Sequence, residues 1–233
     1  VHTNTKFGGK HMKISPTLTE VKEIAKTGKY DILPVSCEIL SDFITPIEAM
    51  RILQNVSTHC YLLESAQANE AWGRYTFLGY DPKLEINCID GHMKLGKLSV
   101  ETENPSEYIR QILSEYKSPK FDYLPSFTGG LVGYFSYDYL GYKEKSIRGK
   151  ARDTEDFKDV DLMLFDKVIA FDNLCQKIIL IANMSLDAPE TGYNKAIVEL
   201  KQLRELLMHG EKKQNMGGKL LGEVTPLFDK EQY

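Results

Sequence analysis

The spacing of apolar residues along the chain predicts four helices, two of them before residue 60. In the first, over residues 17–26, apolar side chains share one face, Ser15-Pro16 supplies a cap and a first-turn proline, and Gly28 ends the helix. The second begins with the sequence TPIE at residues 45–48. This is a capping box, because the Glu48 carboxylate can reach the Thr45 amide while the Thr45 hydroxyl accepts from the Glu48 amide.

The other two helices are expected in the second half of the chain. The sequence NPSE at residues 104–107 repeats the capping device ahead of apolar residues at helical spacing. The longest apolar stripe, over residues 190–209, predicts the fourth helix, which ends at Gly210. Each of these helices would turn one apolar face toward a core.

Between the helices, β-branched and aromatic stretches predict strands. They cover residues 35–39, 59–65, 75–80, 84–89, 92–100, 131–139, 160–171 and 177–182. Asp90-Gly91 fits a hairpin turn in which both central residues have positive φ, and Asp172-Asn173 marks a second turn. Residues 143–159 are charged and predict a solvated loop or surface helix. Because the strands come in groups, the order predicts an α+β fold with helices packed on largely antiparallel sheets.

The two ends of the chain differ from the rest. Residues 1–11 are polar and aperiodic, precede Met12, and are interpreted as a leader or tag. Residues 211–222 are polar and contain glycines, which is typical of a linker. Asp229 followed by Gln232 resembles a helix N-terminus, with Phe228 placed for a hydrophobic staple whose partner would lie at or just after Tyr233. Since one turn of helix cannot nucleate alone, we expect the chain to be a fragment of a longer protein.

Composition narrows the class of protein. With 42% hydrophobic and 27% charged residues the chain can bury a core, and its net charge of −4 is spread along the sequence. Nothing in this pattern favours a nucleic-acid or membrane surface. The four cysteines stand singly without a C-x-x-C pair, so we interpret them as reduced core residues and expect a cytoplasmic protein.

The sequence offers little catalytic chemistry of its own. The five histidines are scattered, and a G-x-S-x-G nucleophile motif is absent, so we predict neither a metal site nor a catalytic residue in this chain. The sequence GGLVG at residues 129–133 lacks the Lys-Ser/Thr of a phosphate-binding loop and leads into a predicted strand. We therefore interpret these glycines as positions of close backbone approach or a bulge.

The strand ending in Leu62-Leu63-Glu64-Ser65 allows two interpretations. An apolar strand that ends in a carboxylate and a hydroxyl most often runs out into solvent. The alternative is a small pocket in which apolar walls hold a ring while Glu64 and Ser65 accept hydrogen bonds from an ammonium group. The composition of the motif does not choose between them.

Three stretches of the sequence stand out together: LLES at residues 62–65, WGRYTFLGYDP at 72–82 and FTGGLVGYFSYD at 127–138. In their order and spacing they resemble the N-terminal region of anthranilate synthase component I and of its close relative aminodeoxychorismate synthase component I. The resemblance extends from about residue 12 to residue 233. It implies the N-terminal half of an α/β/β/α fold with orthogonally packed sheets, in agreement with the α+β prediction.

The resemblance also implies a site and its ligands. In this family the Leu-Leu-Glu-Ser motif helps to bind the feedback inhibitor tryptophan, which assigns Leu63, Glu64 and Ser65 to one wall of that site. Some members use a lysine a short distance after the motif, and the equivalent place here is near Arg74 and Tyr75, so Arg74 is the candidate partner of the inhibitor's carboxylate. The second wall would come from a Pro-Tyr motif later in the protein.

The family's reaction converts chorismate and ammonia to anthranilate and pyruvate, with ammonia delivered by a glutaminase subunit. Its chorismate ligands, Mg²⁺ ligands and catalytic groups lie in the C-terminal half. The resemblance therefore implies an N-terminal domain over residues 12–210, with residues 211–233 as a linker and the start of the chorismate-binding half. It implies no catalytic residue and no cofactor in this chain, with Mg²⁺ expected in the complete enzyme.

Three functions are compatible with this sequence. The stretch Trp72-Gly73-Arg74-Tyr75 after Leu-Glu-Ser favours the anthranilate synthase branch. The aminodeoxychorismate branch of folate biosynthesis shares the fold and is the second hypothesis. The third is a stand-alone amino-acid-binding module, against which the interrupted helix at residues 229–232 argues.

Overall fold

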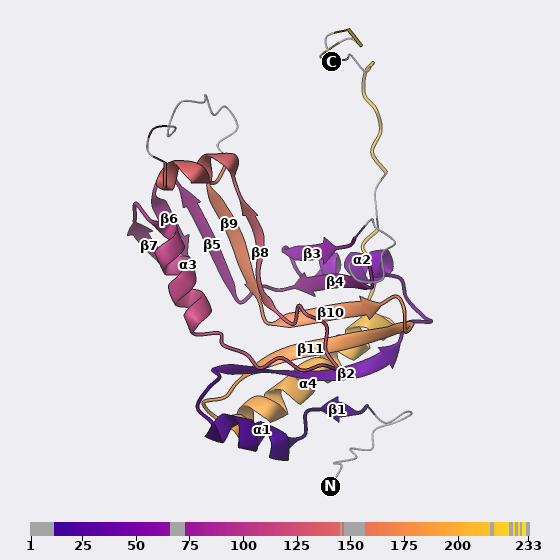
Figure 1. Cartoon of the computed structure of the whole chain (residues 1–233). Helices are drawn as coiled ribbons and strands as arrows, with labels where there is room; N and C mark the ends of the chain where they lie inside the picture. The colour runs from indigo at the N-terminus through magenta and orange to yellow at the C-terminus, as the bar shows by residue number, and fades with distance from the viewer. Residues whose placement is uncertain are drawn as a thin grey trace.

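The computed structural model describes residues 12–65, 73–144, 146, 157–214, 217–223, 226, 228 and 230–231. In this part of the chain, two antiparallel sheets are flanked by helices, and their strands run steeply across one another (Figure 1). The α+β prediction is confirmed. The expected surface segment at 143–159 and the helix start at 229–232 fall largely outside the described residues.

The first sheet has six strands and carries the larger core. In spatial order they are β1 (Ile14–Ser15), β2 (Ile32–Leu40), β11 (Lys177–Ser185), β10 (Lys167–Asp172), β4 (Tyr75–Tyr80) and β3 (Cys60–Leu63). The central strand β11 is buried without interruption from Ile178 to Ala182. Burial on both faces explains why its sequence is continuously apolar rather than alternating.

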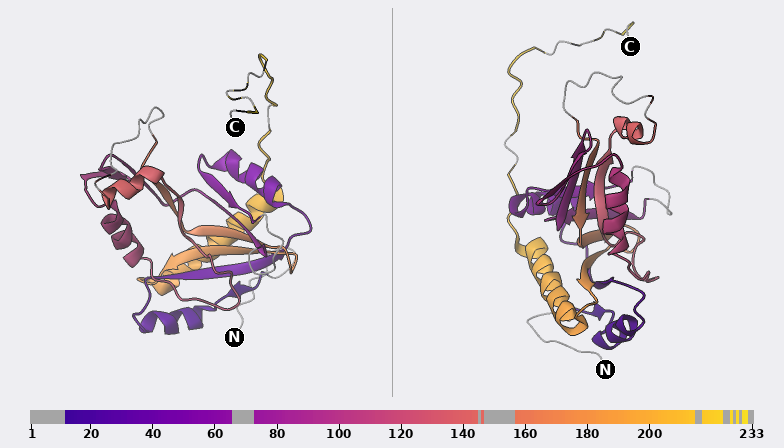
Figure 2. Two further views of the ribbon diagram at one scale, coloured as in Figure 1. Left: turned by 45° about the horizontal axis from the view of Figure 1, so that its top comes forward. Right: turned by 90° about the vertical axis from the view of Figure 1, so that its left-hand side faces the viewer.

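Three helices cover one face of this sheet: α1 (Leu18–Lys26), α2 (Pro46–Val56) and α4 (Pro189–His209). Figure 2 shows α4 running alongside the sheet, where Leu200, Leu203 and Leu207 are buried. On the opposite face, Leu124 and Phe127 pack against a smaller cluster that contains Val168 and Ile179. The six-stranded sheet is therefore covered on both sides.

The ends of these helices test the cap predictions. The capping box of Thr45 and Glu48 is confirmed. The first helix is capped by Thr17 with Glu20 in a second capping box, so the prediction that Ser15 caps it is wrong. Gly210 does end α4, as predicted, but its φ of −65° is not the positive φ for which glycine is usually needed at a helix end. Glycine is needed here for space, because a Cβ would lie 2.4 Å from the Leu206 carbonyl oxygen.

The second sheet has five strands and a separate core. Its spatial order is β7 (Leu98–Glu101), β6 (His92–Leu95), β5 (Leu84–Ile89), β9 (Val160–Phe165) and β8 (Gly130–Phe135). The helix α3 (Pro105–Ser114) and the 3-10 helix η1 (Tyr137–Tyr142) supply side chains to one face of it. The single strand predicted over 92–100 is a hairpin, because the chain reverses at Gly96 with φ of 60°.

Local details of this sheet agree only in part with the predictions made from the sequence. The Asp90-Gly91 turn is confirmed, with φ of 49° and 86°. The strand expected to continue to residue 139 ends at Phe135, and η1 follows. The capping box predicted for the third helix is wrong: the Asn104 side chain makes no cap, and its amide donates to the Glu107 carboxylate instead.

The glycines that open β8 allow close backbone contact, as predicted. Gly133 has φ of 152°, and a Cβ there would lie 1.9 Å from the carbonyl oxygen of Asp161 on β9. A strand follows these glycines, so they present no helix N-terminus to an anion.

The most direct connection between β9 and β10, which lie in different sheets, is a single residue. The apolar stretch predicted as one strand over 160–171 is divided by Asp166 into β9 and β10, which belong to different sheets. The side-chain amide of Asn183 holds this corner by donating to the carbonyl oxygens of Asp166 at 3.0 Å and Thr128 at 2.7 Å.

The cysteines are less uniform than predicted. Cys37 and Cys88 are buried, and burial raises the pKa of the Cys37 thiol to about 12. Cys60 is half-buried, and Cys175 is exposed in the turn after β10. The prediction that all four lie in the core is therefore wrong for Cys175, which lies with the exposed Leu174 in a surface turn.

Candidate functional site

The predicted site residues come together at one end of the six-stranded sheet. β3 ends at Leu63, and Glu64 and Ser65 follow it in exposed positions. The antiparallel pairing of Leu63 with Phe77 places this end beside Arg74 and Tyr75, where β4 begins. The connecting residues 66–72, which include Trp72, lie outside the described residues.

The motif presents different side chains to the two faces of the sheet. Leu62 packs into the core that faces the helices. Leu63 lies opposite Phe77 and so shares its face, on which Tyr75 also lies two residues earlier in β4. The Leu63 side chain is 47% exposed, and within the described residues no group pairs with the Glu64 carboxylate. The strand does run out to solvent here, and it leaves an apolar group and an acceptor accessible.

Arg74 is held by a partner that the sequence did not indicate. Its Nε and Nη2 donate to the two carboxylate oxygens of Asp172 at 3.2 and 2.7 Å. The Asp172 side chain is fully buried, and its Oδ1 also accepts from the amides of Leu174 and Cys175. Arg74 thus joins β4 to the turn between β10 and β11, and a ligand carboxylate would have to share its guanidinium with Asp172.

The charges of this pair are mutually stabilised. Burial by itself acts to raise the pKa of Asp172, but the hydrogen bonds from Arg74 and from the Cys175 amide outweigh it, so the pKa lies below its usual value. The hydrogen bond to Asp172 raises the pKa of Arg74. Burial also raises the pKa of Tyr75, and the Arg74 guanidinium lies 4.9 Å from the centre of its ring. The pair is therefore ionised at neutral pH.

A row of aromatic rings leads from this end of the sheet to the corner between the sheets. The ring centres of Tyr75 and Phe77 are 5.8 Å apart, and those of Phe77 and Phe127 are 5.5 Å apart. Tyr61 then contacts both Phe127, at 6.3 Å, and Phe165, at 4.7 Å. We call these five residues the aromatic row. Phe127 is the first residue of the stretch FTGGLVGYFSYD at residues 127–138. The sequence therefore drew attention to Phe127, but it did not predict the contacts of its ring.

Tyr61 is the most constrained member of the aromatic row. A Cβ on Gly79 would lie 2.2 Å from the Tyr61 ring, so glycine at that position makes room for the ring. The Tyr61 hydroxyl is buried and has no hydrogen-bond partner among the described residues. Burial raises the pKa of this phenol.

The arrangement offers groups for binding: an apolar side chain, acceptors and a guanidinium already paired. In the described ranges no three histidine, cysteine, aspartate or glutamate side chains gather closely enough to hold a metal ion. Across the same residues, no helix is long and apolar enough to cross a membrane.

The fold defines an α+β protein with two crossing antiparallel sheets, and the predicted site residues lie together at one end of the six-stranded sheet. Within that class, the chain belongs to the chorismate binding enzyme family, whose model matches residues 58–233. The match includes all five predicted site residues. It does not separate residues 12–210 from 211–233, so that division stays a prediction.

Two relatives of known name agree with the resemblance seen in the motifs. Anthranilate synthase component 1 of Acetivibrio thermocellus is 34% identical over 198 residues, which are 82% of this chain and 39% of the relative. The protein of the same name from Pseudomonas aeruginosa is 36% identical over 186 residues, covering 76% of this chain and 37% of the relative. The resemblance to this family is thereby confirmed, and the chain spans less than half the length of these relatives.

A solved structure is also similar to this chain. The crystal structure of anthranilate synthase component I from Streptococcus pneumoniae TIGR4 has 25% sequence identity and a TM-score of 0.47. The match covers 71% of this chain and 36% of that chain.

Proposed function

We propose that this chain is part of an anthranilate synthase component I and forms one wall of a site for the feedback inhibitor tryptophan. The observation that carries the proposal is the Leu63-Glu64-Ser65 motif at the exposed end of β3, in a chain whose relatives bear that enzyme's name. The complete protein would convert chorismate and ammonia to anthranilate and pyruvate in tryptophan biosynthesis.

Each part of tryptophan has a matching group at this end of the sheet. The half-exposed Leu63 side chain would contact the indole ring. The Glu64 carboxylate and the Ser65 hydroxyl would accept hydrogen bonds from the ammonium group, of which the bond to the carboxylate is charge-assisted. The inhibitor's carboxylate would share the Arg74 guanidinium with Asp172 and lie against the edge of Tyr75. A second wall would come from outside the residues described.

Inhibition would follow from a shift between two arrangements of the complete subunit. If tryptophan binds one arrangement more tightly, that arrangement becomes more populated, and its affinity for chorismate is lower. A coupling free energy of about 1–3 kcal/mol, typical of allosteric proteins, would be sufficient for a measurable effect.

We place the reaction itself in the part of the relatives that this chain does not span. That part would supply the ligands for chorismate and Mg²⁺ and the acid and base groups, and a glutamine amidotransferase subunit, component II, would deliver ammonia. The chain on its own would be inactive, and we expect the complete enzyme in the cytoplasm.

The first experiment tests the enzyme assignment. The chain and the complete subunit are each incubated with chorismate, ammonia and Mg²⁺, and products are separated by chromatography with fluorescence detection. We expect anthranilate from the complete subunit and none from the chain alone. Aminodeoxychorismate as the product would assign the protein to the folate branch, and turnover by the chain alone would disprove the placement of the reaction.

The second experiment tests the tryptophan site in the complete subunit. Ser65→Phe fills the exposed end of β3 and should raise the tryptophan concentration needed for half inhibition at least tenfold, with little change in kcat. Ser99→Phe, at an exposed position of β7, is the matched control and should be inhibited normally. Equal inhibition of the two variants would contradict the assignment.

A further inference from the structure

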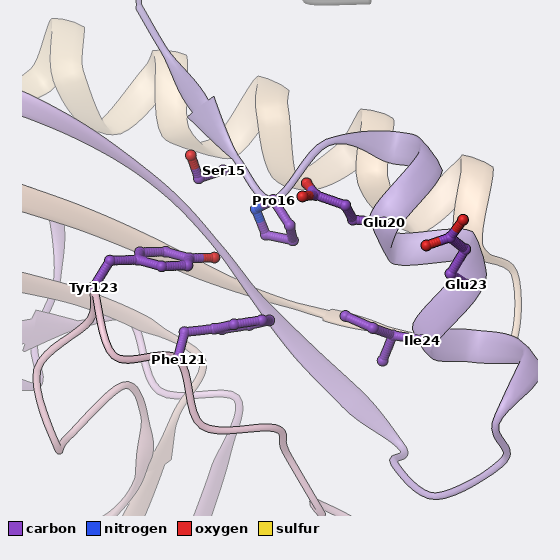
Figure 3. Close-up of a pocket in the computed structure, with 7 residues that line it drawn as sticks. All are labelled: Ser15, Pro16, Glu20, Glu23, Ile24, Phe121 and Tyr123. Carbon is purple, nitrogen blue, oxygen red and sulfur yellow. The ribbon is translucent and has the colours of Figure 1, made fainter.

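A pocket separate from the candidate site lies between α1 and the segment that follows α3 (Figure 3). Its volume is about 320 Å³, the lower end of the range for small-molecule sites. It shares no residue with the tryptophan site proposed above. Binding here therefore neither requires nor tests the proposed function.

One wall of this pocket is aromatic. The rings of Phe121 and Tyr123 are stacked, with centres 5.1 Å apart and planes inclined by 24°. Phe121 also packs against the main core, whereas Tyr123 is 46% exposed. Figure 3 shows both rings extending from one segment toward Pro16 and Ile24. The wall is therefore anchored at one end and open at the other.

The floor is apolar and fixed. Pro16 is buried, and its carbonyl oxygen accepts a hydrogen bond of 3.0 Å from the buried hydroxyl of Tyr193 on α4. Ile24 of α1 packs against the main core. Since both residues are held by the core, the pocket exists without rearrangement of its floor.

The opposite wall carries negative charge. Glu20 and Glu23 are three residues apart on α1 and so project from one side of the helix. One oxygen of Glu20 accepts from the Thr17 amide in the capping box, which fixes that carboxylate at the pocket rim. Among the described residues that line the pocket, none is basic. Lys22, on the same helix, forms an ion pair with Glu190 and does not line the pocket.

The electrostatic environment of Tyr123 agrees with this geometry. Burial raises the pKa of Tyr123 to about 12, and the negative charge of Glu20 adds to the increase. The phenol is therefore neutral at pH 7, and its ring keeps the electron-rich face that attracts cations.

We propose that this pocket binds an organic cation, an ammonium or guanidinium group carried on an aromatic or aliphatic stem. The stem packs against Phe121 and Tyr123, and the cationic group interacts with Glu20 and Glu23. A carboxylate on the ligand would face two like charges, so the site discriminates against free amino acids and organic acids. Amines without a carboxylate, or the side chain of a lysine or arginine in a peptide, satisfy this chemistry.

The test begins with titrations of the chain followed by NMR chemical shifts and calorimetry. The probes are phenethylamine, phenylalanine and 3-phenylpropionate, which share a ring and differ in charge. We expect binding in that order, with phenethylamine strongest and 3-phenylpropionate without saturable binding. Equal binding of all three, or none by phenethylamine, would overturn the proposal. N-acetylarginine amide, compared with phenethylamine, distinguishes a peptide side chain from a free amine as the preferred source.

Matched variants locate the binding. Glu20→Gln removes the charge and keeps the capping box, since glutamine also serves in that position. Glu23→Gln removes the second charge. Each should weaken phenethylamine binding roughly threefold and the double variant about tenfold, as expected for exposed ion pairs. Glu211→Gln, at an exposed position outside the pocket, is the control. Unchanged affinity in the double variant, with the helix intact by circular dichroism, would overturn the assignment to these carboxylates.

Discussion

The two strands that meet at the candidate tryptophan site differ in how they are held. On the β4 side, Arg74 is fixed by two hydrogen bonds to the fully buried Asp172, and Tyr75 lies beneath its guanidinium. On the β3 side, Leu63 is half-exposed and Glu64 and Ser65 follow in solvent. The residues on the β4 side thus stabilise the fold, whereas those on the β3 side are accessible to a ligand.

The largest effect is expected from Asp172→Ala. It leaves Arg74 and the amides of Leu174 and Cys175 without their acceptor, and should lower the free energy of unfolding by about 3 kcal/mol. Chemical denaturation of the chain measures this. Asp187→Ala, at an exposed position, is the control. A loss no greater than that of the control would show that the β4 side is not held by this pair.

Arg74→Met should lower the free energy of unfolding by about 2 kcal/mol at pH 7. This is less than the loss expected for Asp172→Ala, because the Arg74 side chain is partly exposed whereas that of Asp172 is fully buried. The loss should depend on pH. In the wild type the pKa of Asp172 lies below its unfolded value, so the pair contributes stability above about pH 4 and loses it as pH falls. Without Arg74, burial raises that pKa, and ionisation becomes unfavourable in the folded state.

The difference in stability between wild type and Arg74→Met should therefore shrink as pH is lowered from 6 to 3. Denaturation curves at several pH values measure it. Lys94→Met, an exposed change of the same charge, should show no such trend. A difference independent of pH would mean that Asp172 does not titrate through its contact with Arg74.

Tyr61→Phe should act in the opposite direction and stabilise the chain by about 1 kcal/mol. The change removes a buried hydroxyl that lacks a partner among the described residues and keeps the ring contacts with Phe127 and Phe165. Thermal and chemical denaturation measure the gain. Destabilisation would show that the hydroxyl does have a partner, and that the buried part of β3 is held by more than packing.

The smallest effect on stability is expected at the exposed end of β3. Glu64→Gln should leave the denaturation midpoint of the chain unchanged, because within the described residues nothing pairs with its carboxylate. In the complete subunit it should weaken tryptophan binding about fivefold, as loss of a charged acceptor does. A large loss of stability would remove the contrast between the two sides of the site.

Features decided by neighbouring residues were predictable from the sequence. The capping box of Thr45 and Glu48 and the turn at Asp90-Gly91 each depend on a few consecutive residues, and both are confirmed. The capping box predicted from NPSE was wrong, because the same residue types allow a competing contact in which the Asn104 side-chain amide donates to the Glu107 carboxylate.

Long-range features were not predictable in the same way. Arg74 was a candidate for ligand binding, and its partner Asp172 lies 98 residues later in the chain. No local pattern connects the two, because their contact depends on the pairing of β4 with β10. The five predicted site residues do lie together, but that proximity follows from the β3–β4 pairing, and their affinity for tryptophan stays a prediction.

The corner at Asp166 has a consequence for sequence change in this fold. Side chains alternate between the two surfaces of a strand, so the number of residues from β9 to β10 sets the orientation of both sheets at once. A single inserted or deleted residue there would reverse inward and outward positions in one sheet while the other stayed in place. We therefore expect variation in length to be tolerated in the outer hairpins and loops, and the short crossing at Asp166 to accept substitution rather than insertion or deletion.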